Sequence, residues 1–107
     1  MPREDRRITF DYEETYKAVY ALCVQKEFRK PPQGVISAID QNPGDPAKLV
    51  LRIENHLAHK SHDAEYGRDF MAAALMLYCR GLNIPLPKTG QKSVELAPGE
   101  VTLRIQI

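Results

Sequence analysis

All three histidines of the chain lie within nine consecutive residues, in the segment NHLAHKSHD (55–63). Imidazoles bind zinc and transfer protons near neutral pH, so this segment raises the question of a metal or catalytic site. His56, His59 and His62 are spaced three residues apart. A helix would place the third about 240° around from the first, and a strand would point the middle one away from the other two. They are therefore weak candidates for a metal site, and we expect no cofactor.

The rest of the chain contains no recognisable catalytic motif. The segment KTGQKS (88–93) matches a phosphate-binding loop only in part, because that motif needs Lys directly after Gly and then a helix. Here Gln91 separates Gly90 from Lys92, and a strand is expected to follow. We expect a protein without catalytic activity, and a small metal-dependent enzyme centred on residues 54–63 is our third-ranked hypothesis.

Two clusters of basic residues could bind anions. One lies at the C-terminal end of the first predicted helix, and the other occupies the matching place in the second half of the chain. Their members are Lys26, Arg29 and Lys30 in the first cluster, and Arg80, Lys88 and Lys92 in the second. If symmetry relates the two halves, the clusters lie at equivalent ends of the fold and offer a surface to RNA or another anion. The alternative is that they only compensate helix dipoles and are solvated.

The composition predicts an ordinary single domain, residues 1–107, with a balanced charge. The chain has fifteen Lys and Arg residues and fourteen Asp and Glu residues, and the net charge of +1 does not by itself indicate a nucleic-acid or membrane partner. The longest apolar run, Phe70 to Cys79, is too short to cross a membrane, and residues 1–10 lack the apolar region of a secretory signal. We expect a cytoplasmic protein without membrane contact.

The cysteines, Cys23 and Cys79, each lie in an apolar helical stretch and not in a C-x-x-C pair. We expect two buried, reduced thiols, because free Cys behaves as a small apolar residue. A disulfide between Cys23 and Cys79 is the alternative, since the sequence does not define the distance that separates them.

The first half predicts a helix over residues 11–29. Asp11 and Glu14 can form a capping box at its start, and Pro31-Pro32 ends it. One face carries apolar and aromatic residues at helical spacing, a pattern that is more typical of a core-facing stripe than of an aromatic cage. These residues are Tyr12, Tyr16, Val19, Tyr20 and Cys23.

The second half predicts a helix that begins at Asp69 or shortly before it and runs to about Gly81, a natural C-terminal stop. Its segment 70–79 is apolar on all sides, so we expect this helix to be buried. Arg68-Asp69 precedes the apolar segment, and we interpret this pair as serving helix capping.

Alternating apolar and polar residues predict two hairpins. Their strands are expected at 35–40, 48–54, 93–97 and 101–107, with a short extra strand at 8–10 and a weak one at 62–66. Pro-Gly pairs turn both hairpins, and Pro43-Gly44 suits a type II turn.

Together these elements predict an α+β fold in which two helices pack on one face of a mostly antiparallel sheet built from two Pro-Gly hairpins. The order helix, Pro-x-x-Gly, strand, Pro-Gly, strand occurs twice, with corresponding points 52 to 56 residues apart. We interpret this repeated order as a possible αββ pseudo-repeat.

Our first functional hypothesis is a non-catalytic protein-interaction or regulatory module that self-associates as a homo-oligomer, most simply a dimer. The reason is the surplus of apolar surface expected from segment 70–79 and from a C-terminal strand ending in Ile107, together with an open strand edge. The second hypothesis is a nucleic-acid or polyanion binder that uses the two basic clusters.

Overall fold

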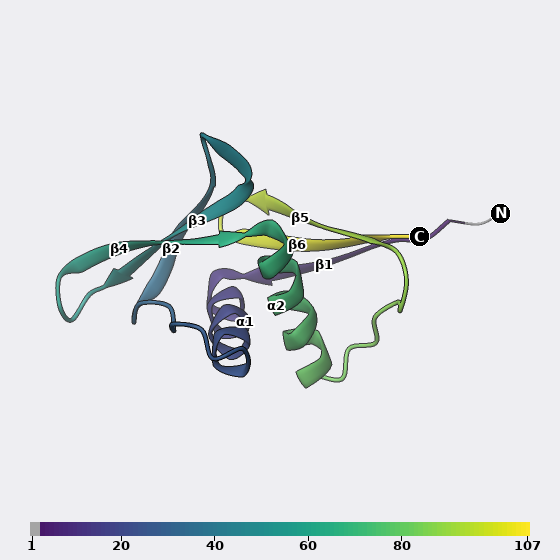
Figure 1. Ribbon diagram of the computed structural model, residues 1–107, viewed down its shortest axis with the longest axis horizontal. Coiled ribbons are helices and arrows are strands. Elements are labelled where there is room, and N and C mark those ends of the chain that lie inside the picture. Colours follow the sequence, from purple (N-terminus) through teal and green to yellow (C-terminus); the bar gives the residue numbers. More distant parts are fainter. Residues whose placement is uncertain (1–2) are drawn as a thin grey trace.

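The computed structural model describes residues 3–107, which form two helices and six strands (Figure 1). In chain order the elements are β1 (Asp5–Asp11), α1 (Tyr12–Gln25), β2 (Val35–Asn42), β3 (Asp45–Asn55), β4 (Lys60–Gly67), α2 (Arg68–Gly81), β5 (Gln91–Ala97) and β6 (Glu100–Gln106). The expected α+β class is confirmed, as are both hairpins and the two additional strands. All strand pairs are antiparallel, but they form two three-stranded sheets, β1-β6-β5 and β2-β3-β4, and not one continuous sheet.

The two halves of the chain have the same order of elements and exchange their first strands. Each half runs strand, helix, strand, strand, so the repeating unit begins one strand earlier than the sequence pattern suggests. β1 of the first half pairs with β6 of the second, and β4 of the second half pairs with β3 of the first. Both helices have 14 residues, and they begin at Tyr12 and Arg68, 56 positions apart. Each sheet therefore contains strands from both halves.

The helices lie side by side beneath the two sheets (Figure 1) and share one hydrophobic core with them. Alternate residues of the central strands point into this core and are fully buried: Leu49, Leu51 and Ile53 on β3, and Val101, Leu103 and Ile105 on β6. No residue of α2 from Phe70 to Cys79 is exposed, and five of these ten residues are buried. Neither helix in the described part of the chain is long and apolar enough to cross a membrane.

α1 ends at Gln25, four residues before the expected end at 29. The predicted capping box is present at its start, but the prolines do not set its end. Glu27 adopts a left-handed conformation (φ 58°), and the Phe28 N–H donates to the carbonyl of Cys23 at 2.9 Å, which closes the last turn. The matching residues of α2, with the same arrangement, are Asn83 (φ 58°), Ile84 and Cys79. The chain between α1 and β2 is consequently longer than expected, whereas the chain between α2 and β5 is slightly shorter, because α2 ends at Gly81 as expected and β5 begins at Gln91.

Arg68 joins the two sheets. Its Nε donates to the carbonyl of Pro46 at 2.7 Å and its Nη1 to the carbonyl of Val94 at 2.8 Å, while Nη2 donates to Oε1 of Gln41 at 2.8 Å. The interpretation of Arg68 as a capping residue is wrong, because the N-cap of α2 is Gly67, which makes no side-chain cap hydrogen bond. Hydrogen bonds from a charged donor are stronger than neutral ones, so Arg68 holds the β2–β3 turn against β5.

The two Pro-Gly turns differ. Gly99 has a positive φ of 75°, as the second central residue of a type II turn requires. Gly44 has no such φ, so the type II prediction for Pro43-Gly44 is wrong. There the Gly44 N–H donates to Oδ1 of Asn42 at 2.8 Å, and the Asn side chain organises the turn locally.

Gly34 and Gly90 occupy equivalent positions before β2 and β5, and in both the backbone requires glycine. Gly34 has φ +150°, and a Cβ there would lie 2.4 Å from the carbonyl oxygen of Glu54. Gly90 has φ +121°, and its Cβ would lie 2.9 Å from the carbonyl oxygen of Gln106. The glycine of each Pro-x-x-Gly motif therefore lets the chain pass close to the neighbouring strand.

Gly34→Ala is expected to lower the free energy of unfolding by about 2–4 kcal/mol, because the backbone of β3 must move and the positive φ is strained. Gly81→Ala is the matched control, since no atom lies within 4 Å of its Cβ and the position is helical. Urea denaturation of both variants measures the difference. Equal stability of the two would contradict the proposed close approach.

Candidate anion-binding site

The three residues of the second basic cluster line one hollow. Arg80 is in the last turn of α2, Lys88 is in the chain that leads to β5, and Lys92 is on β5. The hollow has a volume of about 550 Å³, and its apolar wall includes Ile84 and Leu86. The convergence follows from the fold, because the chain that leaves α2 returns to the sheet and begins β5 at Gln91, next to Lys92.

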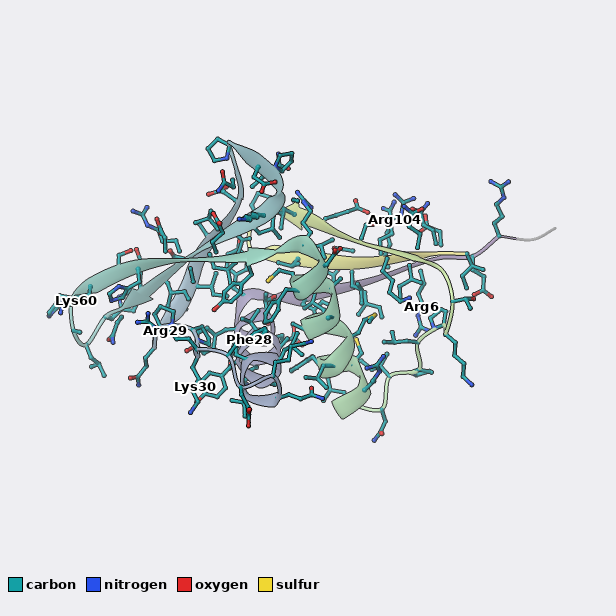
Figure 2. The ribbon with its side chains drawn as sticks, viewed as in Figure 1. Arg6, Phe28, Arg29, Lys30, Lys60 and Arg104 are labelled. Atoms are coloured by element: carbon teal, nitrogen blue, oxygen red, sulfur yellow. The ribbon has the colours of Figure 1, made fainter. Side chains whose placement is uncertain are left out.

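Arg6 adds a fourth positive charge at this end of the sheet. It lies on the same face of β1 as Ile8 and Phe10, and Figure 2 shows it on the helix side of the sheet. Arg6 and Lys92 both pair with Ile105 of the central strand, so their Cα atoms are about 10 Å apart. The positive charge of Arg6 also lowers the pKa of Cys79 in α2, opposing the larger effect of burial, which raises it.

Arg6 was not among the residues predicted from the sequence, because the expected strand began at Ile8. Continuing the alternation of Ile8 and Phe10 two residues toward the N-terminus would have placed Arg6 on the core-facing side. Its closeness to Lys92 could not have been found in this way, since it depends on β1 and β5 flanking the same strand, β6.

The fold itself does not require these cations. Arg6, Ile105 and Lys92 lie side by side across the sheet β1-β6-β5. The corresponding residues of the sheet β4-β3-β2 are His62, Ile53 and Ile36. There Ile36, the counterpart of Lys92, is buried in the core with 3% of its surface exposed. Because an apolar residue satisfies the packing at this position of the repeat, Lys92 contributes charge that the architecture does not need. The counterpart of Arg6 is the exposed His62, so a permanent positive charge is not required there either.

Acidic residues are kept away from the hollow. None lines it in the described part of the chain, and the sequence contains no Asp or Glu between Asp69 and Glu95. On the opposite face of the same sheet, Arg104 donates to both carboxylate oxygens of Asp5, at 2.7 and 3.0 Å, and lies 3.8 Å from Glu95. Figure 2 shows Arg104 on the side of the sheet away from the helices. The hydrogen bonds from Arg104 lower the pKa of Asp5.

Among the described residues, the cations of both predicted clusters have no acidic partner. Within residues 3–107, none of the six forms an ion pair with an acidic side chain. Lys92 Nζ donates only to the carbonyl of Gly90, at 3.3 Å. The hollow therefore carries a concentrated positive charge even though the charge of the whole chain is balanced.

The first basic cluster is divided. Arg29 and Lys30 line a second groove of about 580 Å³ between the chain after α1 and β4, whereas Lys26, the C-cap of α1, does not line it. Tyr66 of β4 also lines this groove. Burial and the nearby Cys23 thiol raise the pKa of Tyr66 to about 12.

The three histidines do not come together. His56 and His59 lie in the turn between β3 and β4 and line a shallow hollow there, whereas His62 lies on β4 and lines the groove of Arg29 and Lys30. All three are exposed. No group of three or more potential metal ligands is found among residues 3–107. The geometry thus provides no support for an enzyme centred on residues 54–63.

The predicted aromatic stripe of α1 is only partly in the core. Tyr12 and Tyr16 are half-buried and pack against the core, and the Tyr16 hydroxyl donates to the carbonyl of Pro32 at 3.0 Å. Tyr20 is 38% exposed. Cys23 and Cys79 are both buried free thiols, and burial raises the pKa of each. Raised thiol pKa values disfavour the reactive thiolate.

Comparisons with known proteins add no assignment: no family model, curated protein or solved structure matches this chain.

The raised pKa of Tyr66 predicts a loss of stability at high pH. Because the phenol has a pKa of about 12 in the folded protein and 10.0 ordinarily, its contribution is complete below pH 10 and is lost as the pH rises toward 12. The free energy of unfolding of the wild-type protein should fall more steeply between pH 10 and 12 than that of Tyr66→Phe. Urea denaturation across this range measures both slopes, and parallel curves would show that Tyr66 titrates normally.

Proposed function

We propose that this protein is a non-catalytic module that binds a polyanion through the hollow formed by Arg80, Lys88 and Lys92, with Arg6 beside it. The observation that supports the proposal is the convergence of these cations from three separate elements on one concave surface without an acidic residue. Compensation of the α2 dipole would account for Arg80 in the last turn of the helix, but not for Lys88 and Lys92.

A polyanion suits this surface better than a small charged metabolite. The Cα atoms of Arg6 and Lys92 are roughly 10 Å apart, and all four cations are half-exposed or exposed, so each keeps much of its hydration. Binding then depends on the release of counterions from a densely charged ligand, a contribution that increases with the number of charges neutralised. The apolar wall restricts the direction from which such a ligand can approach.

Heparin chromatography tests this proposal. The wild-type protein should be retained at about 0.15 M salt, where contacts with closely spaced anionic groups still contribute. The triple variant Arg80→Gln, Lys88→Gln, Lys92→Gln should pass through, because three of the four cations have been removed.

The matched control is Arg7→Gln, Lys17→Gln, Lys48→Gln. It loses the same number of charges, but from residues that pair with acidic side chains away from the hollow. This control should still be retained. Elution of both triple variants at the same salt concentration would show that net charge alone determines retention, and flow-through of the wild-type protein would contradict the proposed function.

Self-association is a second candidate, and part of its expected basis remains: Ile107 is 51% exposed, and both three-stranded sheets have open outer strands among the described residues. Segment 70–79 and the sheets cover one another, so the apolar surplus expected from α2 is absent. The specific observation in favour is a pair of exposed apolar residues one turn apart on α1, Tyr20 (38% exposed) and Val24 (49% exposed). Together with Phe28, just beyond the helix and 55% exposed, they form an apolar strip that a second copy could cover.

If this strip is a dimer interface, light scattering at micromolar concentration should give twice the monomer mass for the wild-type protein. Val24→Asp should give the monomer mass, because it places a carboxylate in the apolar contact. Leu57→Asp is the control, since Leu57 is 94% exposed in the turn between β3 and β4. A monomeric wild-type protein would exclude this candidate.

A further inference from the structure

Phe28 presents an aromatic ring to solvent at a position where the second half of the chain has an aliphatic residue. The closing turn of α1 holds its backbone in place, and 55% of its surface is exposed. Its counterpart after α2 is Ile84, which is half-buried against the core. An aliphatic residue therefore satisfies the packing at this position of the repeat. Packing does not explain why Phe28 has an exposed aromatic ring.

The ring of Phe28 belongs to a stack of three aromatic side chains. Its centroid lies 6.1 Å from that of Phe70, with an interplanar angle of 27°, and Phe70 lies 5.2 Å from Tyr66, with an angle of 15°. Phe70 and Tyr66 are half-buried, so the inner rings support the outer one. A rigid ring that is stacked on one side and open to solvent offers a flat surface to a further ring.

Cations adjoin this stack. Figure 2 shows Phe28, Arg29 and Lys30 together in the chain between α1 and β2. Arg29 and Lys30 line the groove that also contains Tyr66 and His62. Lys30 Nζ lies 5.8 Å above the ring of Tyr20, a cation–π distance that keeps this charge beside the aromatic group.

Two acidic residues of β4, Asp63 and Glu65, also border the groove. Side chains alternate along a strand, so these two belong to the face of the sheet opposite to that of His62, Ala64 and Tyr66. Glu65 is held on that face, where it accepts from Asn42 Nδ2 at 2.6 Å and lies 3.6 Å from Lys48. The charge that faces the groove is therefore positive.

From these observations we infer that Phe28, with Arg29 and Lys30, is a stacking platform for an unpaired base, and that the polyanion is single-stranded nucleic acid. This inference rests on the proposed function, in which the hollow lined by Arg80, Lys88 and Lys92 supplies further phosphate contacts. Aromatic stacking accepts any base because every base has a π-face, and the neighbouring cations neutralise the adjoining phosphates. A double-stranded ligand keeps its bases paired and offers none to Phe28.

The chain contains no tryptophan, so Phe28→Trp introduces a single fluorescent reporter at the platform. Titration with an oligothymidylate of about 15 nucleotides should quench its emission, because the indole stacks on a thymine ring. Inorganic polyphosphate, which has similar charge and no bases, should bind without this quenching. Val35→Trp is the control reporter, since Val35 is similarly exposed (57%) and lies outside the aromatic stack.

Affinity provides the second measurement. Phe28→Leu keeps an apolar side chain and removes the ring, so it should bind labelled oligothymidylate roughly ten-fold more weakly in fluorescence anisotropy, within the range expected for the loss of one stacked base. Its affinity for polyphosphate should be unchanged.

The outcomes separate the two proposals. Equal quenching by oligothymidylate and polyphosphate, or an unchanged oligothymidylate affinity in Phe28→Leu, would overturn the stacking platform while the polyanion site stands. Absence of binding to either ligand by the wild-type protein would overturn the proposed function as well. Because Phe28 is more than half exposed and Leu is apolar, Phe28→Leu is expected to fold, and its thermal midpoint verifies this.

Discussion

The exchange of first strands between the two halves is the constraint on which the rest of the structure depends. Neither hairpin has a third strand from its own half, and neither helix has a complete sheet of its own half to cover. Only when β1 pairs with β6 and β4 with β3 does each sheet reach three strands and present a full apolar face. The core between helices and sheets is consequently shared, and the stability of each half depends on the other.

This exchange also distributes the charges. Because β1 and β5 flank β6, residues that are 86 positions apart in the chain, Arg6 and Lys92, lie on one face of a small sheet. The opposite face of the same sheet pairs Arg7 and Arg104 with Asp5 and Glu95. One face is thus internally neutral, and the other ends in a positive hollow beside α2. The balanced net charge of the chain conceals this separation.

Departures from the internal repeat indicate where function is to be sought. At equivalent positions the second half has Lys92 where the first has buried Ile36, and the first half has exposed Phe28 where the second has half-buried Ile84. A repeat shows which residue types the packing accepts at a position. A charged or exposed aromatic residue at such a position is therefore not explained by packing, and these differences carry both of the binding proposals made above.

The local features of this protein could be predicted from its sequence because they arise from short-range physics. Helical periodicity and the Asp11–Glu14 capping box located α1, an apolar run located α2, and alternation with Pro-Gly pairs located the hairpins. The basic residues Arg80, Lys88 and Lys92 were visible as a cluster in the same way. The end of α1 was misjudged, because a left-handed Glu27 stops the helix before the prolines do.

Only the tertiary structure decided which strands pair, that two sheets form, and that Arg6 and Lys92 share one end of a sheet. It also assigned Arg68 to a junction between sheets and separated the three histidines that the sequence places together. The physical reason is the same in each case. Periodicity specifies which side of an element faces the core, but pairing between strands far apart in the chain is selected by the joint burial of all elements, which no local pattern records.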